Sequence, residues 1–160
     1  MNTLFKPSEK IKIFDAATGQ IQEVEKVYKT DVQWQKILTP EQYNVTRLKG
    51  TEQPFTGLCV LPKKDEVGAY QCVGCSTDLF LVSTKYESGT GWPSFWDPVS
   101  DLNIKTETDT SYGSARIEVL CARCDAHLGH VFNDGPLPTG KRYCMNAVAL
   151  KFVKVNLLKK

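Results

Sequence analysis

Two Cys-x-x-Cys pairs constrain the fold of this chain more than any other feature. They read Cys72-Val-Gly-Cys75 and Cys121-Ala-Arg-Cys124, and each ends an apolar run, GAYQC or IEVLC, where a strand can enter a tight turn. Two such turns supply the four soft ligands that tetrahedral Zn²⁺ prefers. We therefore expect one Zn²⁺ held by Cys72, Cys75, Cys121 and Cys124, which would join distant segments of the chain.

Other interpretations of these cysteines remain open. One pair alone resembles a thioredoxin-like redox motif, although no βαβ pattern surrounds either pair. Iron in a rubredoxin-like site is chemically possible, as are four unrelated buried cysteines. If all four ligands are cysteines, no coordination position stays open, and the metal is structural and not catalytic.

The composition is that of an ordinary soluble domain. The chain has 160 residues, 41% of them hydrophobic and 24% charged, and its net charge of +2 includes no dense basic block. Wholesale disorder is excluded, a membrane span is not expected because no run approaches about 18 apolar residues, and nucleic acid is disfavoured as a partner. The first residues, MNTLFKPSEK, lack the apolar core of a signal peptide, so we expect a cytoplasmic protein.

The N-terminal segment predicts a hairpin and two helices. Two short strands flank a turn at Thr18-Gly19 within residues 11–27, and a helix follows with Asp31 as its candidate N-cap. The next helix should span residues 40–48, because Thr39, Pro40 and Gln42 form a capping-box pattern.

Beyond Gly50 the chain changes character. Short apolar runs alternate with Gly, Pro, Ser and Asp, which is typical of an antiparallel β domain. We expect residues 1–30 to be an extension that forms a hairpin on the domain, and residues 31–155 to be a single domain.

Cys144 lies in KRYCMNAV, which predicts a strand. Side chains two residues apart share a face, so Arg142, Cys144 and Asn146 should point the same way. A guanidinium beside the thiol would favour the nucleophilic thiolate. The alternative is a buried, inert cysteine.

The two histidines of the chain, His127 and His130, follow the second cysteine pair in AHLGHVF. With four thiolates available to a metal, we expect these histidines to be free for acid–base chemistry, although two ordinary core or surface histidines are the alternative. Trp92, Phe95 and Trp96 lie in the Gly-rich segment KYESGTGWPSFWDP. Trp92 is a candidate pocket residue, whereas the other two are expected in the core.

Six segments together resemble one family, the B-type methionine sulfoxide reductases. The similarity runs from about Trp34 to Phe152 through LTPEQY, GTEQPF, GAYQCVGC, KYESGTGWPSF, CARCDAHLGHVFNDGP and RYCMNAVAL. The resemblance implies a mainly β, Mss4-like (β-tent) fold, in which twisted antiparallel sheets surround the four-cysteine zinc site and short helices lie near the N-terminus.

The resemblance also implies an enzyme that reduces methionine-R-sulfoxide in oxidised proteins. Cys144 aligns with the nucleophile, which becomes a sulfenic acid that thioredoxin or another thiol reduces. His127, His130 and Asn146 align with polar site residues, and Trp92 with the aromatic that holds the substrate methyl group. Arg142 would help to ionise Cys144. We expect this enzyme to be a cytoplasmic monomer.

One position departs from the family pattern. Many members carry a resolving cysteine in the loop before GWPSF, where this chain has Thr90. Cys59 would be the possible resolving residue, provided that its Cα approaches that of Cys144 within about 7 Å. Otherwise Cys59 is a small buried residue and an external thiol acts directly.

A function of another class also fits a double zinc knuckle. Such a fold can dock a protein or nucleic acid without catalysis, and this function would not need Cys144, His127 or His130.

Overall fold

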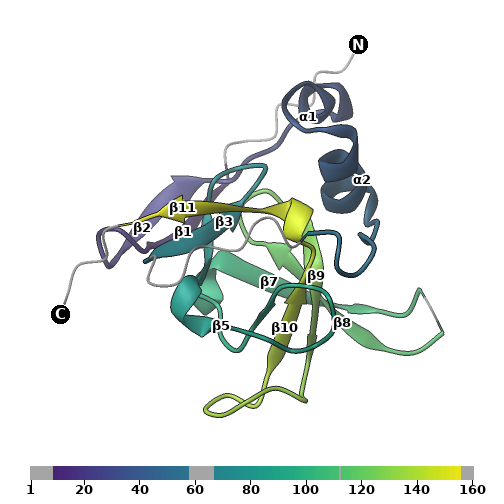
Figure 1. Ribbon diagram of the computed structural model, residues 1–160. Coiled ribbons are helices and arrows are strands. Elements are labelled where there is room, and N and C mark those ends of the chain that lie inside the picture. The colour runs from purple at the N-terminus through teal and green to yellow at the C-terminus, as the bar shows by residue number, and fades with distance from the viewer. Residues whose placement is uncertain (1–8, 58–66, 112, 156–160) are drawn as a thin grey trace.

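Antiparallel sheets make up most of the fold, and short helices lie near its N-terminal end (Figure 1). The structure is a computed structural model that describes residues 9–57, 67–111 and 113–155. Within these residues, the largest sheet has six strands in the order β5 (Lys85–Tyr86), β6 (Ser94–Phe95), β10 (Arg142–Met145), β9 (His127–Phe132), β8 (Arg116–Cys121) and β7 (Ile104–Asp109).

Smaller sheets complete the β structure. One has the order β11 (Leu150–Lys154), β3 (Gly68–Cys72) and β4 (Asp78–Leu81), and the other is the hairpin of β1 (Lys10–Asp15) and β2 (Gln20–Glu25). Short 3₁₀ helices lie between strands: η2 (Val82–Thr84), η3 (Asp101–Asn103) and η4 (Ala147–Ala149). With the four-cysteine cluster described below, this architecture confirms the expected fold class.

Capping residues determine where both helices begin. Helix α2 (Pro40–Leu48) begins after Thr39, whose side chain and that of Gln42 form the predicted capping box. Helix α1 (Asp31–Ile37) begins after Thr30, and Thr30 forms the same reciprocal bonds with Gln33. The prediction of Asp31 as N-cap was therefore wrong by one residue, because the hydroxyl of Thr30 already satisfies the backbone N–H of Gln33. Asp31 instead places its negative charge in the first turn, at the positive end of the helix dipole.

The β1–β2 hairpin lies against the rest of the chain through hydrogen bonds of its backbone. Asn103 accepts from the Phe14 N–H at 2.7 Å and donates to the Phe14 carbonyl at 2.9 Å, so one buried amide satisfies both groups. After β2, the N–H of Val27 donates to the carbonyl of Arg123 at 2.9 Å. The hairpin is thereby joined to the turn that carries Cys121 and Cys124.

The aromatic core includes residues from both larger sheets. Phe80 of β4 stacks on Phe95 of β6 with ring centroids 4.4 Å apart, and Tyr70 of β3 meets Phe95 edge-on at 5.2 Å. Phe95 is fully buried, as predicted, whereas Trp96 is only half-buried. Within the part of the chain that the structure describes, no helix has the length and apolar character needed to cross a membrane.

Candidate metal centre and active site

The two cysteine pairs occupy turns of the same construction. Cys72 ends β3 and Cys121 ends β8, and each of their carbonyls accepts an N–H bond at 2.9 Å from the residue four positions later. These later residues, Ser76 and Asp125, have φ angles of 64° and 63°. Polar residues with short side chains tolerate this left-handed conformation better than most others. The repeated geometry directs both pairs of sulfurs to one point.

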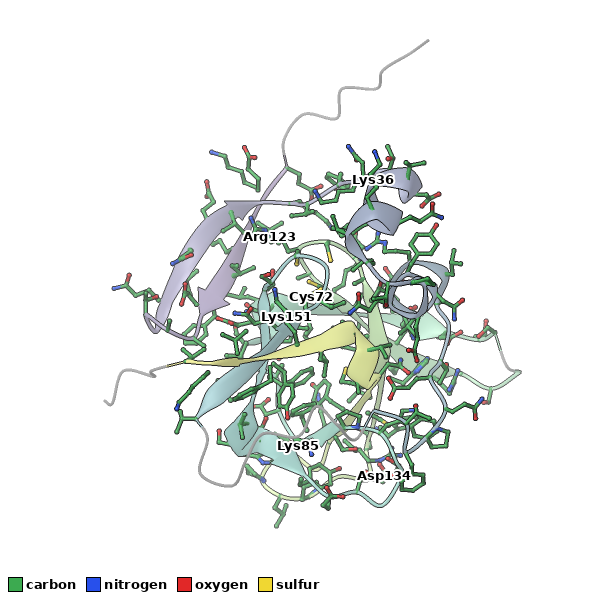
Figure 2. All side chains as sticks on the ribbon, turned by 45° about the horizontal axis from the view of Figure 1, so that its top comes forward. Lys36, Cys72, Lys85, Arg123, Asp134 and Lys151 are labelled. Carbon is green, nitrogen blue, oxygen red and sulfur yellow. The ribbon has the colours of Figure 1, made fainter. Side chains whose placement is uncertain are left out.

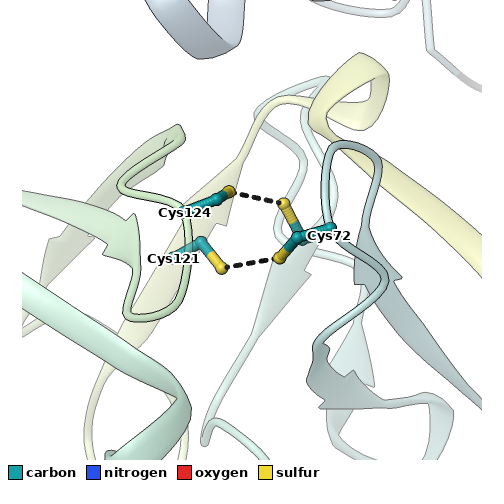
Figure 3. A group of neighbouring side chains, drawn as sticks. Cys72, Cys121 and Cys124 are labelled. Carbon is teal, nitrogen blue, oxygen red and sulfur yellow. Dashed lines mark hydrogen bonds between the residues drawn. The ribbon is translucent and has the colours of Figure 1, made fainter. Parts of the chain in front are cut away.

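The four sulfurs form a cluster of the size that a tetrahedral metal requires. All four lie within 4.8 Å of one another, with Sγ atoms 3.5 Å apart for Cys72–Cys124 and for Cys75–Cys121 (Figure 3). Zn–S bonds of about 2.3 Å would place tetrahedral sulfurs about 3.8 Å apart. Three of the cysteines are buried and Cys75 is half-buried, and Cys72 lies within the body of the molecule in Figure 2. The donor set therefore fits a four-coordinate thiophilic metal.

The helices cover this metal centre. Trp34 of α1 is buried and its ring lies against Gly74, between the two cysteines of the first pair, where an added Cβ would come within 3.1 Å of the ring. Arg47 of α2 contacts the Trp34 ring, with its guanidinium carbon 4.5 Å from the centroid, and donates to the carbonyl of Cys124 at 2.8 Å. The helical segment thus shields the centre from water.

A second group of sequence-predicted residues meets in a cleft of about 270 Å³. Strand register explains why, because directly paired residues share a face. Glu118 of β8 pairs with His130 of β9, His130 pairs with Cys144 of β10, and Cys144 pairs with Ser94 of β6. The cleft over this row is lined by Thr51, Thr90, Trp92, Arg116, His130, Phe132, Arg142, Cys144, Met145 and Asn146.

Cys144 is a half-buried thiol that lines the cleft. Burial raises the pKa of this thiol, while the Arg142 guanidinium and the hydroxyls of Thr90 and Ser94 lower it by a smaller amount. Arg142 thus favours the thiolate, but desolvation outweighs the nearby cation, so the pKa of Cys144 is raised overall.

Arg142 shares its charge with another residue. Its guanidinium donates to both carboxylate oxygens of Asp134, at 2.9 and 3.1 Å, and its central carbon lies 4.4 Å from the Phe132 ring centroid. The bidentate pair holds the guanidinium at the rim of the cleft. The charge that Cys144 experiences is therefore partly neutralised.

Both histidines of β9 point to the same face, which a regular strand would not allow for residues three apart. The pairing of β8 with β9 is irregular at this point. Val119 pairs with Gly129, but the next residue, Leu120, pairs with His127, so the register skips Leu128. The ring centroids of His127 and His130 consequently lie 5.5 Å apart. Both rings are buried, and His130 lines the cleft, whereas His127 is not among the lining residues.

The backbone of Glu52 holds two further side chains of the cleft. The Trp92 indole N–H donates to the carbonyl of Glu52 at 3.1 Å, and the N–H of Glu52 donates to Asn146 Oδ1 at 3.0 Å. Asn146 Nδ2 donates to the carbonyl of Leu128 at 3.0 Å. Both polar ends of the Asn146 amide are thus engaged by backbone groups, and its orientation is fixed.

Thr90, at the position where the resemblance led us to expect a resolving cysteine, lies beside Cys144 with its Oγ1 4.0 Å from the Cys144 Sγ. The other candidate for a resolving role, Cys59, lies outside the described residues. The structure thus places Thr90 beside Cys144, the predicted nucleophile, and the role of Cys59 stays a prediction.

Several residues of this site were not singled out from the sequence. Glu118 and Asp109 bind the histidines, Glu52 holds the loop, and Asp134 pairs with Arg142. Glu118 alone had a local signal, since it interrupts the apolar run IEVL. The other three depend on contacts between segments distant in sequence.

Comparisons with known proteins agree with this geometry. The SelR domain family model matches residues 38–154. The protein named peptide methionine sulfoxide reductase MsrB in Methanosarcina barkeri is 56% identical over 79% of this chain and 87% of its own length. The protein of that name in Leptospira interrogans is 55% identical over 80% of this chain and 96% of its own length.

Among solved structures, the crystal structure of the Mis18 'Yippee-like' domain is similar over 57% of this chain and 99% of its own, with 19% identity and a TM-score of 0.45. The SelR match spans the cysteine cluster and the cleft together. The chain belongs to the SelR-domain family of B-type peptide methionine sulfoxide reductases.

Proposed function

We propose that this chain reduces methionine-R-sulfoxide in oxidised proteins by attack of Cys144 on the sulfoxide sulfur. The observation that carries this proposal is the row in which Cys144 pairs directly with His130 across β9 and β10, inside one cleft. A nucleophile and an acid–base group on adjacent strands can act on the bonded sulfur and oxygen of one sulfoxide group.

The reaction begins with the sulfoxide oxygen directed toward His130. Protonation of that oxygen makes the sulfur electrophilic, and the Cys144 thiolate then attacks it. The S–O bond of the substrate breaks, methionine leaves, and Cys144 becomes a sulfenic acid. The sulfoxide thereby gains the two electrons that Cys144 loses.

Two further residues bind the substrate in this proposal. The half-buried Trp92 ring offers an aromatic face for the S-methyl group, a contact that sulfur compounds favour. Asn146, fixed by its backbone bonds, offers a polar edge for the sulfoxide oxygen or a water bound to it. Arg142 limits the rise in the pKa of Cys144 that burial causes.

The cysteine cluster has a separate, structural role in this proposal. Zn²⁺ would be held by Cys72, Cys75, Cys121 and Cys124, and with four thiolates it would crosslink β3 to β8 without an open position for substrate. Thiolate ligands require reducing conditions, which agrees with a cytoplasmic location.

The second half-reaction uses a thiol. Thioredoxin or a small thiol would attack the sulfenic acid, release water and form a mixed disulfide, which a second thiol resolves. If Cys59 resolves internally, Cys59→Ser will abolish any disulfide to Cys144. Retained thioredoxin-dependent turnover in that variant would show that Cys59 is dispensable.

The test is a single turnover without reductant on peptides that contain either sulfoxide epimer. We expect one methionine per chain from the R epimer and none from the S epimer. Equal yields from both epimers, or none from the R epimer by a folded chain with its metal bound, would contradict the proposal. The second result would favour a binding module.

A further inference from the structure

Each histidine of the site is bound by its own buried or half-buried carboxylate. Glu118 Oε2 lies 2.6 Å from His127 Nδ1, and Asp109 Oδ2 lies 2.8 Å from His130 Nε2. The two carboxylates therefore engage opposite ring nitrogens. An ionised carboxylate can only accept a hydrogen bond, so each of these nitrogens must carry a proton.

Neighbouring donors keep both carboxylates in place. Lys49 Nζ lies 3.2 Å from the other oxygen of Glu118, whose side chain is only 4% exposed. The backbone N–H of Ser111 donates to Asp109 Oδ1 at 2.9 Å, and an Arg116 guanidinium nitrogen lies 3.4 Å from Oδ2. Hydrogen bonds from Ser111, followed by that from His130, lower the pKa of Asp109. Glu118 thus keeps Oε2 for His127, whereas Oδ2 of Asp109 accepts from His130 and also faces Arg116.

The two rings lie in different electrostatic environments. Burial lowers the pKa of His127 despite the opposing effect of Glu118, and the charges of His130 and Lys49 lower it further. His130 faces Asp109, Cys144 and the charged rim of Arg116 and Arg142. Two imidazolium ions 5.5 Å apart would repel each other, so the neutral ring is His127.

We propose that Glu118 and Asp109 are positioning residues that hold the two histidines in opposite tautomers, with the proton on Nδ1 of His127 and on Nε2 of His130. This inference rests on the proposed function. Asp109 leaves Nδ1 of His130 as the nitrogen that gains and gives the catalytic proton, and its negative charge stabilises the imidazolium. Glu118 keeps His127 as a neutral neighbour whose Nε2 is the acceptor nitrogen.

Replacing each carboxylate with the amide of the same shape should reverse the tautomer of the histidine that it binds. In Glu118→Gln, the amide oxygen should face the Lys49 ammonium, which only donates, and the NH₂ group would then face His127 Nδ1. In Asp109→Asn, the Ser111 N–H would hold the amide oxygen, and the NH₂ group would face His130 Nε2 and displace the Arg116 guanidinium nitrogen from that position. In each variant, the proton of the affected histidine ring must then move to the opposite ring nitrogen. Glu23→Gln is the matched control, because this exposed carboxylate of β2 forms its ion pair with Lys10 in the β1–β2 hairpin, outside the six-stranded sheet that carries both histidines.

The experiment combines ¹⁵N NMR of the histidine rings with single-turnover reduction of a methionine-R-sulfoxide peptide, on the full chain with its metal bound. We expect opposite tautomers in the wild type and reversal at the substituted site in each variant. Single-turnover rates should fall at least about tenfold in both variants and stay unchanged in Glu23→Gln.

Identical tautomers in the wild type would overturn the inference, and this measurement needs no variant to fold. Reversed tautomers with unchanged single-turnover rates would also overturn it. A wild-type chain that shows opposite tautomers but makes no methionine would instead contradict the proposed function, so the two failures are distinguishable.

Discussion

Five cysteines in the described part of the chain lie in two contrasting environments. Four of them converge from two turns of the same construction, where short-range backbone bonds fix each pair. Cys144 lies apart from them in a cleft assembled from β9, β10 and two loops. The first environment is built from local sequence and suits a metal, whereas the second needs the whole sheet and suits chemistry. The metal centre and the reactive thiol should therefore be separable by mutation.

Loss of the metal centre should have the largest effect. Cys72→Ser removes a buried ligand, so the chain should lose its metal and its cooperative folding, since structural zinc can supply about 10 kcal/mol of folding free energy. Metal analysis and thermal unfolding followed by circular dichroism measure this. A Cys72→Ser protein that retains wild-type stability would show that the cluster is not the support of the fold.

Loss of the reactive thiol should have the next largest effect, and on activity alone. Cys144→Ser should lower single-turnover reduction by about 10⁴-fold or more, because the proposed reaction depends on this one nucleophile. Metal content and the unfolding midpoint should stay at wild-type values. Release of metal from this variant would contradict the claim that the metal centre and Cys144 are separable by mutation.

Removal of the aromatic face should weaken substrate binding to a smaller degree. Trp92→Ala deletes the proposed methyl-binding ring, and we expect KM to rise about tenfold, equivalent to about 1.4 kcal/mol. Trp92→Phe is the control, because it keeps an aromatic face and should lose less. Steady-state kinetics on a peptide substrate would detect the difference, and an unchanged KM in Trp92→Ala would argue against this role.

Loss of the nearby cation should change the titration of Cys144. Arg142 lowers the pKa of this thiol against the opposing effect of burial, so Arg142→Met should move its deprotonation to higher pH. Each unit of increase reduces the thiolate fraction at neutral pH about tenfold. The pH dependence of Cys144 alkylation measures this, with Lys36→Met in α1 as a distant control. If the pH midpoint of Cys144 alkylation stays constant or falls in Arg142→Met, Arg142 does not lower the pKa of this thiol.

A cysteine at position 90 should have the smallest effect on the first turnover. Because Thr90 Oγ1 lies 4.0 Å from Cys144 Sγ, Thr90→Cys should form an internal disulfide after one turnover while changing the first-turnover rate by less than about threefold. Non-reducing peptide mapping detects the product. Absence of this disulfide after methionine release would mean that the cleft does not bring the two positions together during catalysis.

Sequence alone predicted the parts of the molecule that short-range rules determine. The cysteine spacing indicated both metal-binding turns, the Thr39 and Gln42 pair indicated α2, and two-residue periodicity placed Arg142 and Cys144 on one face. Each of these features depends on residues within a few positions of one another.

The remaining features depend on register and burial, which no local pattern encodes. The β9 irregularity brings His127 and His130 to one face, and Glu118 reaches His127 only because β8 pairs with β9. The pKa of Cys144 is raised because loops and strands distant in sequence exclude water from it. The sequence shows that Arg142 is close to Cys144. It does not show that burial raises the pKa of the thiol by more than Arg142 lowers it.

The most direct test of the two-environment account is a map of cysteine oxidation after one equivalent of methionine-R-sulfoxide, without reductant. Mass spectrometry with a sulfenic-acid trap should find oxidation at Cys144, alone or as a disulfide with Cys59. The four clustered cysteines should be unmodified, and the metal should remain bound. Oxidation within the cluster, or no change at Cys144 while methionine is formed, would contradict the account.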